Sequence, residues 1–281
     1  MQRKFKEKRF EYEELGVKQN EKDRTMCKLF GYSAKTEYDI NEYLKTFYQY
    51  STQHPNGWGL ACMDSNGVVI EKEPIQATKS NYLKERLTNP VVAKNVFAHI
   101  RFATVGNEEY ANCHPFSLRD NRGRQWVLIH NGTIFDFRPL KKYIKTQSGT
   151  TDSERILLYI VDIINRTERD GKILSDRERF EILDCLIGNM AKGNKLNLMI
   201  YDGTMMYIHS NYKDSMYYLE KKGAMLFSTS PLTEERWKKV PFTRLLAYQN
   251  GIMKFTGKNH GNEYFESEEK LKFIFQNYSE L

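Results

Sequence analysis

Cysteine is scarce in this sequence, and long apolar runs are absent from it. The four cysteines, Cys27, Cys62, Cys113 and Cys185, are widely scattered and form no CxxC pair. This pattern excludes a disulfide-rich scaffold and gives no zinc-binding spacing, so we expect reduced thiols, a cytoplasmic location, no metal and no cofactor. No apolar run reaches the length of a membrane span, and the N-terminus has no hydrophobic signal-peptide core, so we expect no membrane association.

Charge of one sign is not concentrated anywhere in the chain. The formal net charge is +7 and the pI is about 9.0. Residues 1–26 contain eight Lys or Arg and six Asp or Glu, so they carry +2 and leave +5 spread over residues 27–281. We interpret this charge as a solvated surface and expect no nucleic-acid partner. The alternative, nucleic-acid binding, predicts an affinity that falls steeply with salt.

The composition suits a packed core, with 40% hydrophobic and 13% aromatic residues over 281 positions. Residues 1–26 are mostly polar, with few apolar positions after Phe10, and we interpret them as a charged leader. At Cys27 the pattern changes abruptly to a short apolar run. We therefore predict a leader over residues 1–26 and a single domain over residues 27–281.

Hydrophobic periodicity and turn signals predict an α+β fold with mainly antiparallel sheets. Turn residues at Asn66-Gly67 and Asp202-Gly203 favour two hairpins. Helical spacing predicts helices over residues 39–50, 152–166 and 176–191, with Asp152 as an N-cap or first-turn residue. The predicted strands are residues 27–33, 59–63, 68–73, 96–104, 126–130, 196–201, 205–209, 224–229, 244–249 and 251–255.

Five short motifs place polar, reactive or glycine residues at the ends of these elements. They are Met-Cys at 26–27, His-Pro-Asn-Gly-Trp-Gly at 54–59, His-Ile-Arg-Phe-Ala-Thr at 99–104, His-Asn-Gly at 130–132 and Thr-Asp-Ser-Glu at 151–154. In this order and spacing they resemble the class II glutamine amidotransferase domain, a branch of the N-terminal-nucleophile hydrolases. The likeness is strongest to stand-alone bacterial members, whose sequences open Met-Cys and carry a His-Pro-Asp-Gly-Trp-Gly loop.

The resemblance covers Cys27 to about Phe255 and includes Asn-Cys-His-Pro-Phe at 112–116 and Ser-Thr-Ser-Pro-Leu at 228–232. It implies a four-layer αββα sandwich, in which two mainly antiparallel sheets lie between helices. One departure is Asn56, where these relatives usually carry Asp, in a loop that helps to shape the surroundings of the nucleophile.

The resemblance implies that Cys27 is the nucleophile, and the chemistry of a terminal cysteine agrees with it. A cysteine at the chain terminus has a base built in, because its own α-amino group has an unperturbed pKa of about 7.7–8.0. That amine can take the proton of the thiol, whose unperturbed pKa is about 8.5, directly or through one water, so no catalytic histidine is needed. The alternative for Cys27 is a small buried hydrophobic residue on a strand.

By resemblance, the side-chain amide of Asn131 and the backbone N–H of Gly132 hold the oxyanion that forms when the thiol attacks the substrate amide. A glycine suits close approach of the backbone to a substrate, because it has no Cβ. The alternative for Asn131 and Gly132 is a plain turn.

Free glutamine is a zwitterion, so a specific site should neutralise both of its charged ends. Arg101 is the candidate for the α-carboxylate, because a guanidinium binds a carboxylate through two parallel hydrogen bonds. Thr104 is a supporting donor if the strand ends or bulges there. Asp152 is the candidate for the α-ammonium. The alternatives are a surface strand residue for Arg101 and a helix N-cap for Asp152.

Other residues of the sequence have structural interpretations. We expect His99 and His114 to be structural hydrogen-bonding residues and not catalysts. We expect Cys62 and Cys185 to lie in the core. Trp58 either lines the pocket or packs in the core.

The resemblance implies an amidohydrolase that cleaves a γ-glutamyl amide through a thioester on Cys27, releasing ammonia and glutamate. The substrate is glutamine or another γ-glutamyl compound, and an ammonia-accepting synthase is a candidate partner. While residues 1–26 are attached, the nitrogen of Cys27 is an amide and cannot act as the base. We therefore expect translation from Met26, or removal of residues 1–26, in the active form. If Cys27 is not a free N-terminus, the alternative is a catalytically silent binding or regulatory protein.

Overall fold

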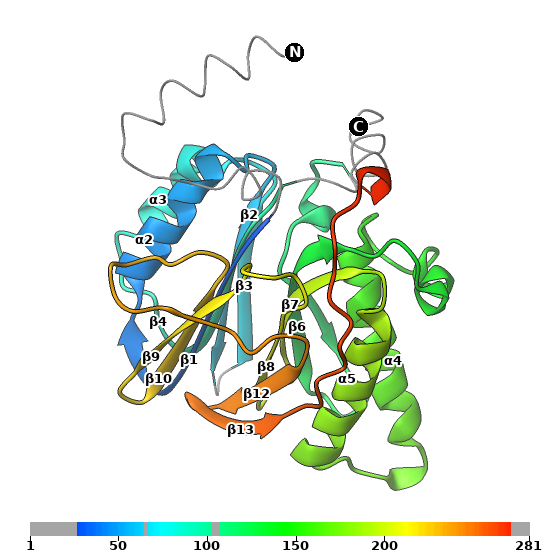
Figure 1. Ribbon diagram of the computed structural model, residues 1–281. Coiled ribbons are helices and arrows are strands. Elements are labelled where there is room, and N and C mark those ends of the chain that lie inside the picture. Colours follow the sequence, from blue (N-terminus) through cyan, green and yellow to red (C-terminus); the bar gives the residue numbers. More distant parts are fainter. Residues whose placement is uncertain (1–26, 65–66, 103–106, 271–281) are drawn as a thin grey trace.

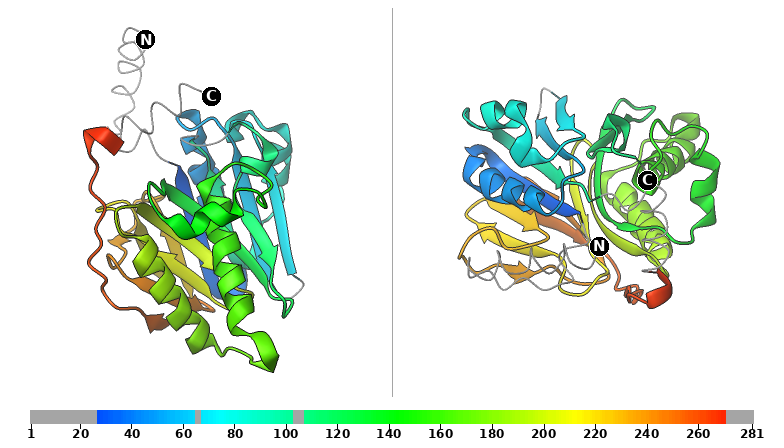
Figure 2. Two further views of the ribbon diagram at one scale, coloured as in Figure 1. Left: turned by 90° about the vertical axis from the view of Figure 1, so that its right-hand side faces the viewer. Right: turned by 90° about the horizontal axis from the view of Figure 1, so that it is seen from above.

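Two β-sheets lie face to face in the computed structural model, and helices cover their outer faces (Figure 1, Figure 2). The structure describes residues 27–64, 67–102 and 107–270. Every strand pair within these ranges is antiparallel. The prediction of a four-layer αββα sandwich is confirmed.

The first sheet carries the strand that follows the proposed nucleophile. Its strands are β1 (Lys28–Asp39), β2 (Trp58–Asp64), β3 (Gly67–Glu73), β4 (Val92–Ile100), β9 (Tyr217–Lys221), β10 (Ala224–Ser228) and β11 (Lys238–Lys239). They are ordered β11-β9-β10-β1-β4-β2-β3. Because β1 pairs with both β10 and β4, it is a central strand, and Cys27 directly precedes it.

The second sheet carries the Asn-Gly pair of the His-Asn-Gly motif. Its strands are β5 (Phe116–Arg119), β6 (Gln125–Thr133), β7 (Lys195–Tyr201), β8 (Met206–His209), β12 (Leu245–Gln249) and β13 (Ile252–Thr256). They are ordered β13-β12-β8-β7-β6-β5. Strand β5 pairs with β6 only as far as Leu128, so the last residues of β6 extend beyond it.

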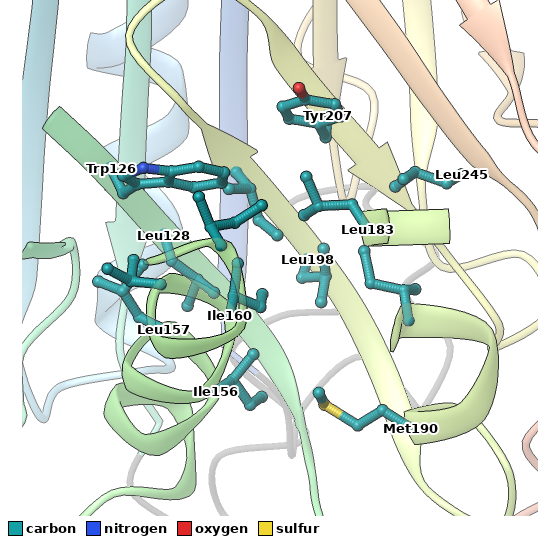
Figure 3. Close-up of a cluster of buried hydrophobic side chains, with 14 of the residues drawn as sticks. Trp126, Leu128, Ile156, Leu157, Ile160, Leu183, Met190, Leu198, Tyr207 and Leu245 are labelled. Carbon is teal, nitrogen blue, oxygen red and sulfur yellow. The ribbon is translucent and has the colours of Figure 1, made fainter. Parts of the chain in front are cut away.

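Helices cover the outer face of each sheet. The α-helices are α2 (Asn41–Gln49), α3 (Asn81–Arg86), α4 (Asp152–Thr167) and α5 (Asp176–Met190), and short 3-10 helices are η2 (Tyr50–Thr52), η3 (Ala77–Lys79), η4 (Tyr110–Asn112), η5 (Arg138–Tyr143) and η6 (Arg169–Gly171). Apolar side chains of α2 and α3 pack on the first sheet. Figure 3 shows the cluster beneath α4 and α5, where Trp126 and Leu128 of β6 lie close to Ile160 of α4.

Strand alternation determines which side chains face the opposite sheet, because successive side chains point to opposite faces. A third apolar cluster lies between the sheets and includes Leu29 of β1, Phe97 of β4 and Ile129 of β6. The sheets approach closely there, since a Cβ on Gly31 would lie 2.6 Å from the sulfur of Met199. Residues that continue these inner faces past the cluster are therefore directed toward the space between the sheets.

Most of the predicted strands and helices are confirmed, including the hairpins β2–β3 and β7–β8. Strands β5, β9 and β11 and helix α3 are additions to the prediction. Cys62 packs partly against the core beneath α2 and α3. The expectation that Cys185 lies in the core is wrong, because the helical rotation of α5 exposes it between the buried Leu183 and Ile187.

Candidate active site

Cys27 lies beside the chain that leaves β4. The first residue of β1, Lys28, pairs with Ile100, the last residue of β4. This pairing brings the sulfur of Cys27 to the backbone of Phe102, whose N–H donates to the sulfur over 3.2 Å. The thiol can donate in turn to the Phe102 carbonyl over 3.3 Å. The thiolate thus has a fixed donor, and the thiol has a fixed acceptor.

Three of the candidate residues continue the inner faces of the sheets. Cys27 is two residues before Leu29, Arg101 is four residues after Phe97, and Asn131 is two residues after Ile129. Residues separated by an even number along a strand share a face, so all three are directed toward the space between the sheets. This convergence agrees with the electrostatics, because the charge of Arg101 acts on the Cys27 thiol.

The pKa of the Cys27 thiol is raised, and its burial is the largest cause. The Phe102 N–H and the positive charge of Arg101 lower the pKa of this thiol, while the negative charge of Asp152 raises it. Burial prevails over the stabilising contacts, so the thiol is protonated at neutral pH. A nucleophile in this state needs a base to accept its proton.

Arg101 is buried, with 2% of its surface exposed, so the alternative of a surface strand arginine is wrong. Its backbone N–H donates to the Gly57 carbonyl over 2.8 Å, and its guanidinium Nη1 donates to the Asn107 carbonyl over 3.0 Å. The guanidinium is therefore held in place within the fold. Thr104, the supporting donor predicted from the sequence, lies outside the described residues.

Asn131 and Gly132 lie within strand β6, paired with Asn197 and Leu196 of β7, so the alternative of a plain turn is wrong. A Cβ on Gly132 would lie 1.9 Å from the carbonyl oxygen of Lys195. Packing against β7 therefore requires a glycine at position 132. The sequence had suggested a different reason, the close approach of the backbone to a substrate. Within the described ranges no hydrogen bond joins the side chain of Asn131 to another residue, although this side chain is buried.

Asp152 is the first residue of α4, and Thr151 is the N-cap, whose hydroxyl accepts the Glu154 N–H over 3.3 Å. The first-turn placement of Asp152 is confirmed, and the N-cap alternative is wrong. One carboxylate oxygen of Asp152 accepts the N–H of Ile134, just past the end of β6, over 2.8 Å. The buried carboxylate of Asp152 is thereby tied to the strand that carries Asn131.

The comparisons with known proteins agree with this geometry. A family model described as glutamine amidotransferases class-II matches residues 26–224. The chain belongs to this family. The uncharacterized protein MJ1515 of Methanocaldococcus jannaschii is 29% identical to it over 262 residues, which cover 83% of this chain and 72% of MJ1515. Membership of the class II glutamine amidotransferases supports a glutamine-hydrolysing enzyme.

Solved structures of amidotransferases share the fold. A predicted glutamine amidotransferase from Pseudomonas aeruginosa aligns with a TM-score of 0.59 and 21% identity, over 81% of this chain and 99% of that chain. The glutamine phosphoribosylpyrophosphate amidotransferase from B. subtilis aligns with a TM-score of 0.58 and 17% identity, over 83% of this chain and 49% of that chain. At these identities the likeness shows the fold alone.

In this amidotransferase the loop at residues 54–59 is tied to the candidate substrate-binding arginine. The N–H of Asn56 donates to the Arg101 carbonyl over 3.2 Å, and the Asn56 side-chain amide donates to the Glu108 carboxylate. Gly57 has a φ of +140°, and a Cβ there would lie 2.7 Å from the sulfur of Cys113. Trp58 is fully buried in the core beneath α2 and α3, which decides between its two interpretations.

The histidines of the motifs are buried and neutral. The Nε2 atom of His99 lies 3.2 Å from the His130 carbonyl oxygen, and the ring of His99 stacks on His114 with 4.0 Å between centroids. His114 makes no side-chain hydrogen bond within the described ranges, so only His99 fits the expected hydrogen-bonding role. Burial lowers the pKa of His99 to about 3 and that of His114 well below its ordinary value. Each ring is therefore a neutral imidazole at neutral pH and carries no positive charge.

Two contacts of the site are absent from the sequence-based prediction. One is the Phe102 backbone at the thiol, which depends on the register between β1 and β4. The other is Thr229, whose hydroxyl accepts the Leu29 N–H over 3.2 Å and whose own N–H donates to the Leu29 carbonyl over 3.1 Å. The Ser-Thr-Ser-Pro-Leu motif was the available signal for Thr229, since it follows a strand that pairs with β1.

The described part of the chain contains no group of three or more His, Cys, Asp or Glu residues that could hold a metal ion. None of its helices has the length and apolarity that a bilayer crossing needs.

Proposed function

We propose that this chain hydrolyses the side-chain amide of glutamine through a γ-glutamyl thioester on Cys27. The observation that carries the proposal is the convergence of Cys27, Arg101 and Asn131 on the space between the sheets, with the buried carboxylate of Asp152 tied to the end of the strand that carries Asn131. A buried arginine and a buried carboxylate in one site with a thiol match the two charged ends of a glutamyl group. The family match supports the same substrate class.

The reaction has two halves. The thiol of Cys27 gives its proton to the α-amine, and the sulfur attacks the amide carbon and forms an oxyanion, which accepts hydrogen bonds from the Asn131 side chain and the Gly132 N–H. The carbon–nitrogen bond then breaks, the amine returns the proton, and ammonia leaves. Water attacks the thioester through the same oxyanion site, which yields glutamate and restores the thiol.

Recognition of the substrate rests on its glutamyl end. Arg101 binds the α-carboxylate, Asp152 binds the α-ammonium, and Thr104 supplies a further donor. A γ-glutamyl compound with another leaving group presents the same two charges, so it is the alternative substrate. The ammonia is released or passed to a synthase partner, and we place the enzyme in the cytoplasm.

The mechanism requires that Cys27 is the first residue of the active protein. Its nitrogen is an amide while Met26 is attached, and an amide nitrogen cannot accept the thiol proton. We propose that residues 1–26 are removed or not translated in the active form. The mass of the N-terminal peptide of the protein from its native host tests this directly.

The decisive experiment compares ammonia release from glutamine by protein beginning at Cys27, by the Cys27→Ala variant and by the matched variant Cys185→Ala. We expect Cys27→Ala to abolish release and Cys185→Ala, which changes an exposed thiol on α5, to retain it. Retained release by Cys27→Ala would overturn the mechanism. Release from γ-glutamyl derivatives but not from glutamine would assign the alternative substrate, and no release from either would favour a binding or regulatory protein.

A further inference from the structure

A histidine side chain joins the two sheets beside the site. His99 lies in β4, where it pairs with Leu29 of β1 and Gly59 of β2. Its ring is fully buried, and its Nε2 atom lies 3.2 Å from the carbonyl oxygen of His130 in β6. The bond therefore runs from the sheet that positions Cys27 to the sheet that carries Asn131.

The direction of this hydrogen bond follows from the chemistry of its two groups. A carbonyl oxygen only accepts, so the Nε2 atom of His99 carries the hydrogen and donates it. Burial lowers the pKa of His99 to about 3, so the ring is neutral and keeps this donor over the physiological pH range. The other nitrogen, Nδ1, has no hydrogen-bond partner among the described residues.

The carbonyl that accepts this hydrogen bond belongs to the peptide group that links His130 to Asn131. Strand β5 begins at Phe116, opposite Leu128, so this part of β6 lies beyond its pairing with β5. A backbone group without a strand partner on one side is less constrained than one inside a sheet. The His99 ring supplies a donor at a position that the neighbouring strand does not reach.

Both contacting groups are themselves held in place. The ring of His114 stacks on His99 at 4.0 Å, and the chain around it is fixed by Lys72, whose ammonium donates to the Cys113 carbonyl over 2.7 Å. On the helix side of β6, the His130 ring lies 2.9 Å from the Ser153 hydroxyl of α4. Contacts on both faces of β6 thus hold the peptide group before Asn131 in place.

We propose that His99 is a positioning residue that sets the distance and orientation of Asn131 relative to Cys27. The inference rests on the proposed function, in which Asn131 donates to the oxyanion. His99 touches neither the substrate nor the reacting atoms. Its effect passes through the carbonyl of His130, and a misplacement of about 1 Å can cost roughly 10²-fold in rate.

The test uses protein that begins at Cys27 and measures kcat and KM for glutamine. His99→Met removes the donor at similar length, and His99→Gln retains an N–H near the position of Nε2. We expect His99→Met to lower kcat by between about tenfold and a hundredfold with little change in KM, because Arg101 and Asp152 are untouched. We expect His99→Gln to recover most of kcat.

A double-mutant cycle separates positioning from a general loss of stability. In the Asn131→Ala background, the oxyanion donor is gone, so His99→Met should lower kcat no further. An equal loss in both backgrounds, or a wild-type kcat for His99→Met, would overturn the inference. If His99→Met does not fold, His99→Asn, whose amide is too short to reach the carbonyl, replaces it against His99→Gln. Activity that survives Cys27→Ala would overturn the proposed function instead, so the two failures are distinct.

Discussion

The backbone N–H of Phe102 points at the sulfur of Cys27 across 3.2 Å, from the chain that leaves the neighbouring strand. This donor stabilises the thiolate, and so does the positive charge of Arg101, but burial outweighs both and raises the pKa of the thiol. The thiol of the resting site is therefore protonated at neutral pH. A base is needed to start the reaction, and the α-amine of Cys27 is the group that we propose.

This arrangement predicts how activity depends on pH. The α-amine must be unprotonated to accept the proton of the thiol, so kcat/KM for glutamine should rise with pH through about 7–8, the range of an unperturbed α-amine. A rising limb with a midpoint near pH 6 would instead indicate a histidine base. Addition of one glycine before Cys27 should abolish the activity at every pH, because it converts the amine into an amide.

Stability should fall in acid because of the buried histidines. Burial lowers the pKa of His54, His99 and His209 to about 3. The unfolded chain binds these protons below about pH 6.5 and the folded chain binds them only near pH 3, so stability is lost as the pH falls between these values. In this window each histidine lowers the free energy of unfolding by up to about 1.4 kcal/mol for each unit that the pH falls. Urea unfolding at pH 7, 5.5 and 4.5 measures the slope, and a flat profile would contradict the prediction.

Asn131→Ala should lower kcat by about 10²–10³-fold and leave KM for glutamine nearly unchanged, because an oxyanion donor acts in the transition state. The thermal midpoint should stay close to that of the parent protein, since the Asn131 side chain bonds to no other described residue. Steady-state kinetics and a thermal melt check both parts. A large drop in the melting temperature would assign Asn131 a structural role.

Asp152→Asn should weaken binding of glutamine and leave the helix intact. The amide oxygen can still accept the Ile134 N–H, and Thr151 still caps α4, so the substitution removes the charge and only the long contact with the Ser153 hydroxyl. A hydrogen bond to a charged group contributes about 1.5–3 kcal/mol, which corresponds to roughly 10–150-fold in kcat/KM. Glu154→Gln, an acidic residue of the same turn that accepts the N–H groups of Ser148 and Gly149, is the matched control and should keep its kcat/KM.

Asn56→Asp restores the residue that the related sequences carry, and here we expect it to impair the enzyme. The Asn56 amide donates to the Glu108 carboxylate, and a second carboxylate would repel it. Arg101 is bonded next to both members of this pair, because its carbonyl accepts the Asn56 N–H and its guanidinium donates to the carbonyl of Asn107, which precedes Glu108. The repulsion should therefore displace Arg101 and raise KM for glutamine, by about fivefold if it amounts to about 1 kcal/mol. The double variant N56D/E108Q should recover the lost affinity, and no recovery would place the effect elsewhere.

The sequence was sufficient for features that depend on local signals. Alternation and turn residues located β2, β3, β7 and β8, and helical spacing located α4 with Asp152 in its first turn. Periodicity along a single segment is enough for such predictions. The candidates Cys27, Arg101 and Asn131, which the fold directs into one space, came instead from five motifs that resemble those of a known family.

Other features depend on pairing between distant segments, which a local pattern does not contain. The Asn131-Gly132 dipeptide has turn propensity, but pairing with β7 keeps it extended, and the Lys195 carbonyl occupies the space of a Cβ on Gly132. Short strands such as β5 and β11 carry too few residues for a period of two to stand out. The contact of Phe102 with Cys27 exists only through the register of β1 against β4.

Because Cys185 is exposed on α5, it affects any titration of active sites by thiol labelling. Burial raises the pKa of Cys62 and of Cys113 to about 11, so both thiols react slowly with alkylating reagents at neutral pH. Cys185, in contrast, meets any reagent in solution. One label per chain would therefore mark the helix and not the nucleophile, and a stoichiometric titration of Cys27 requires the Cys185→Ala background.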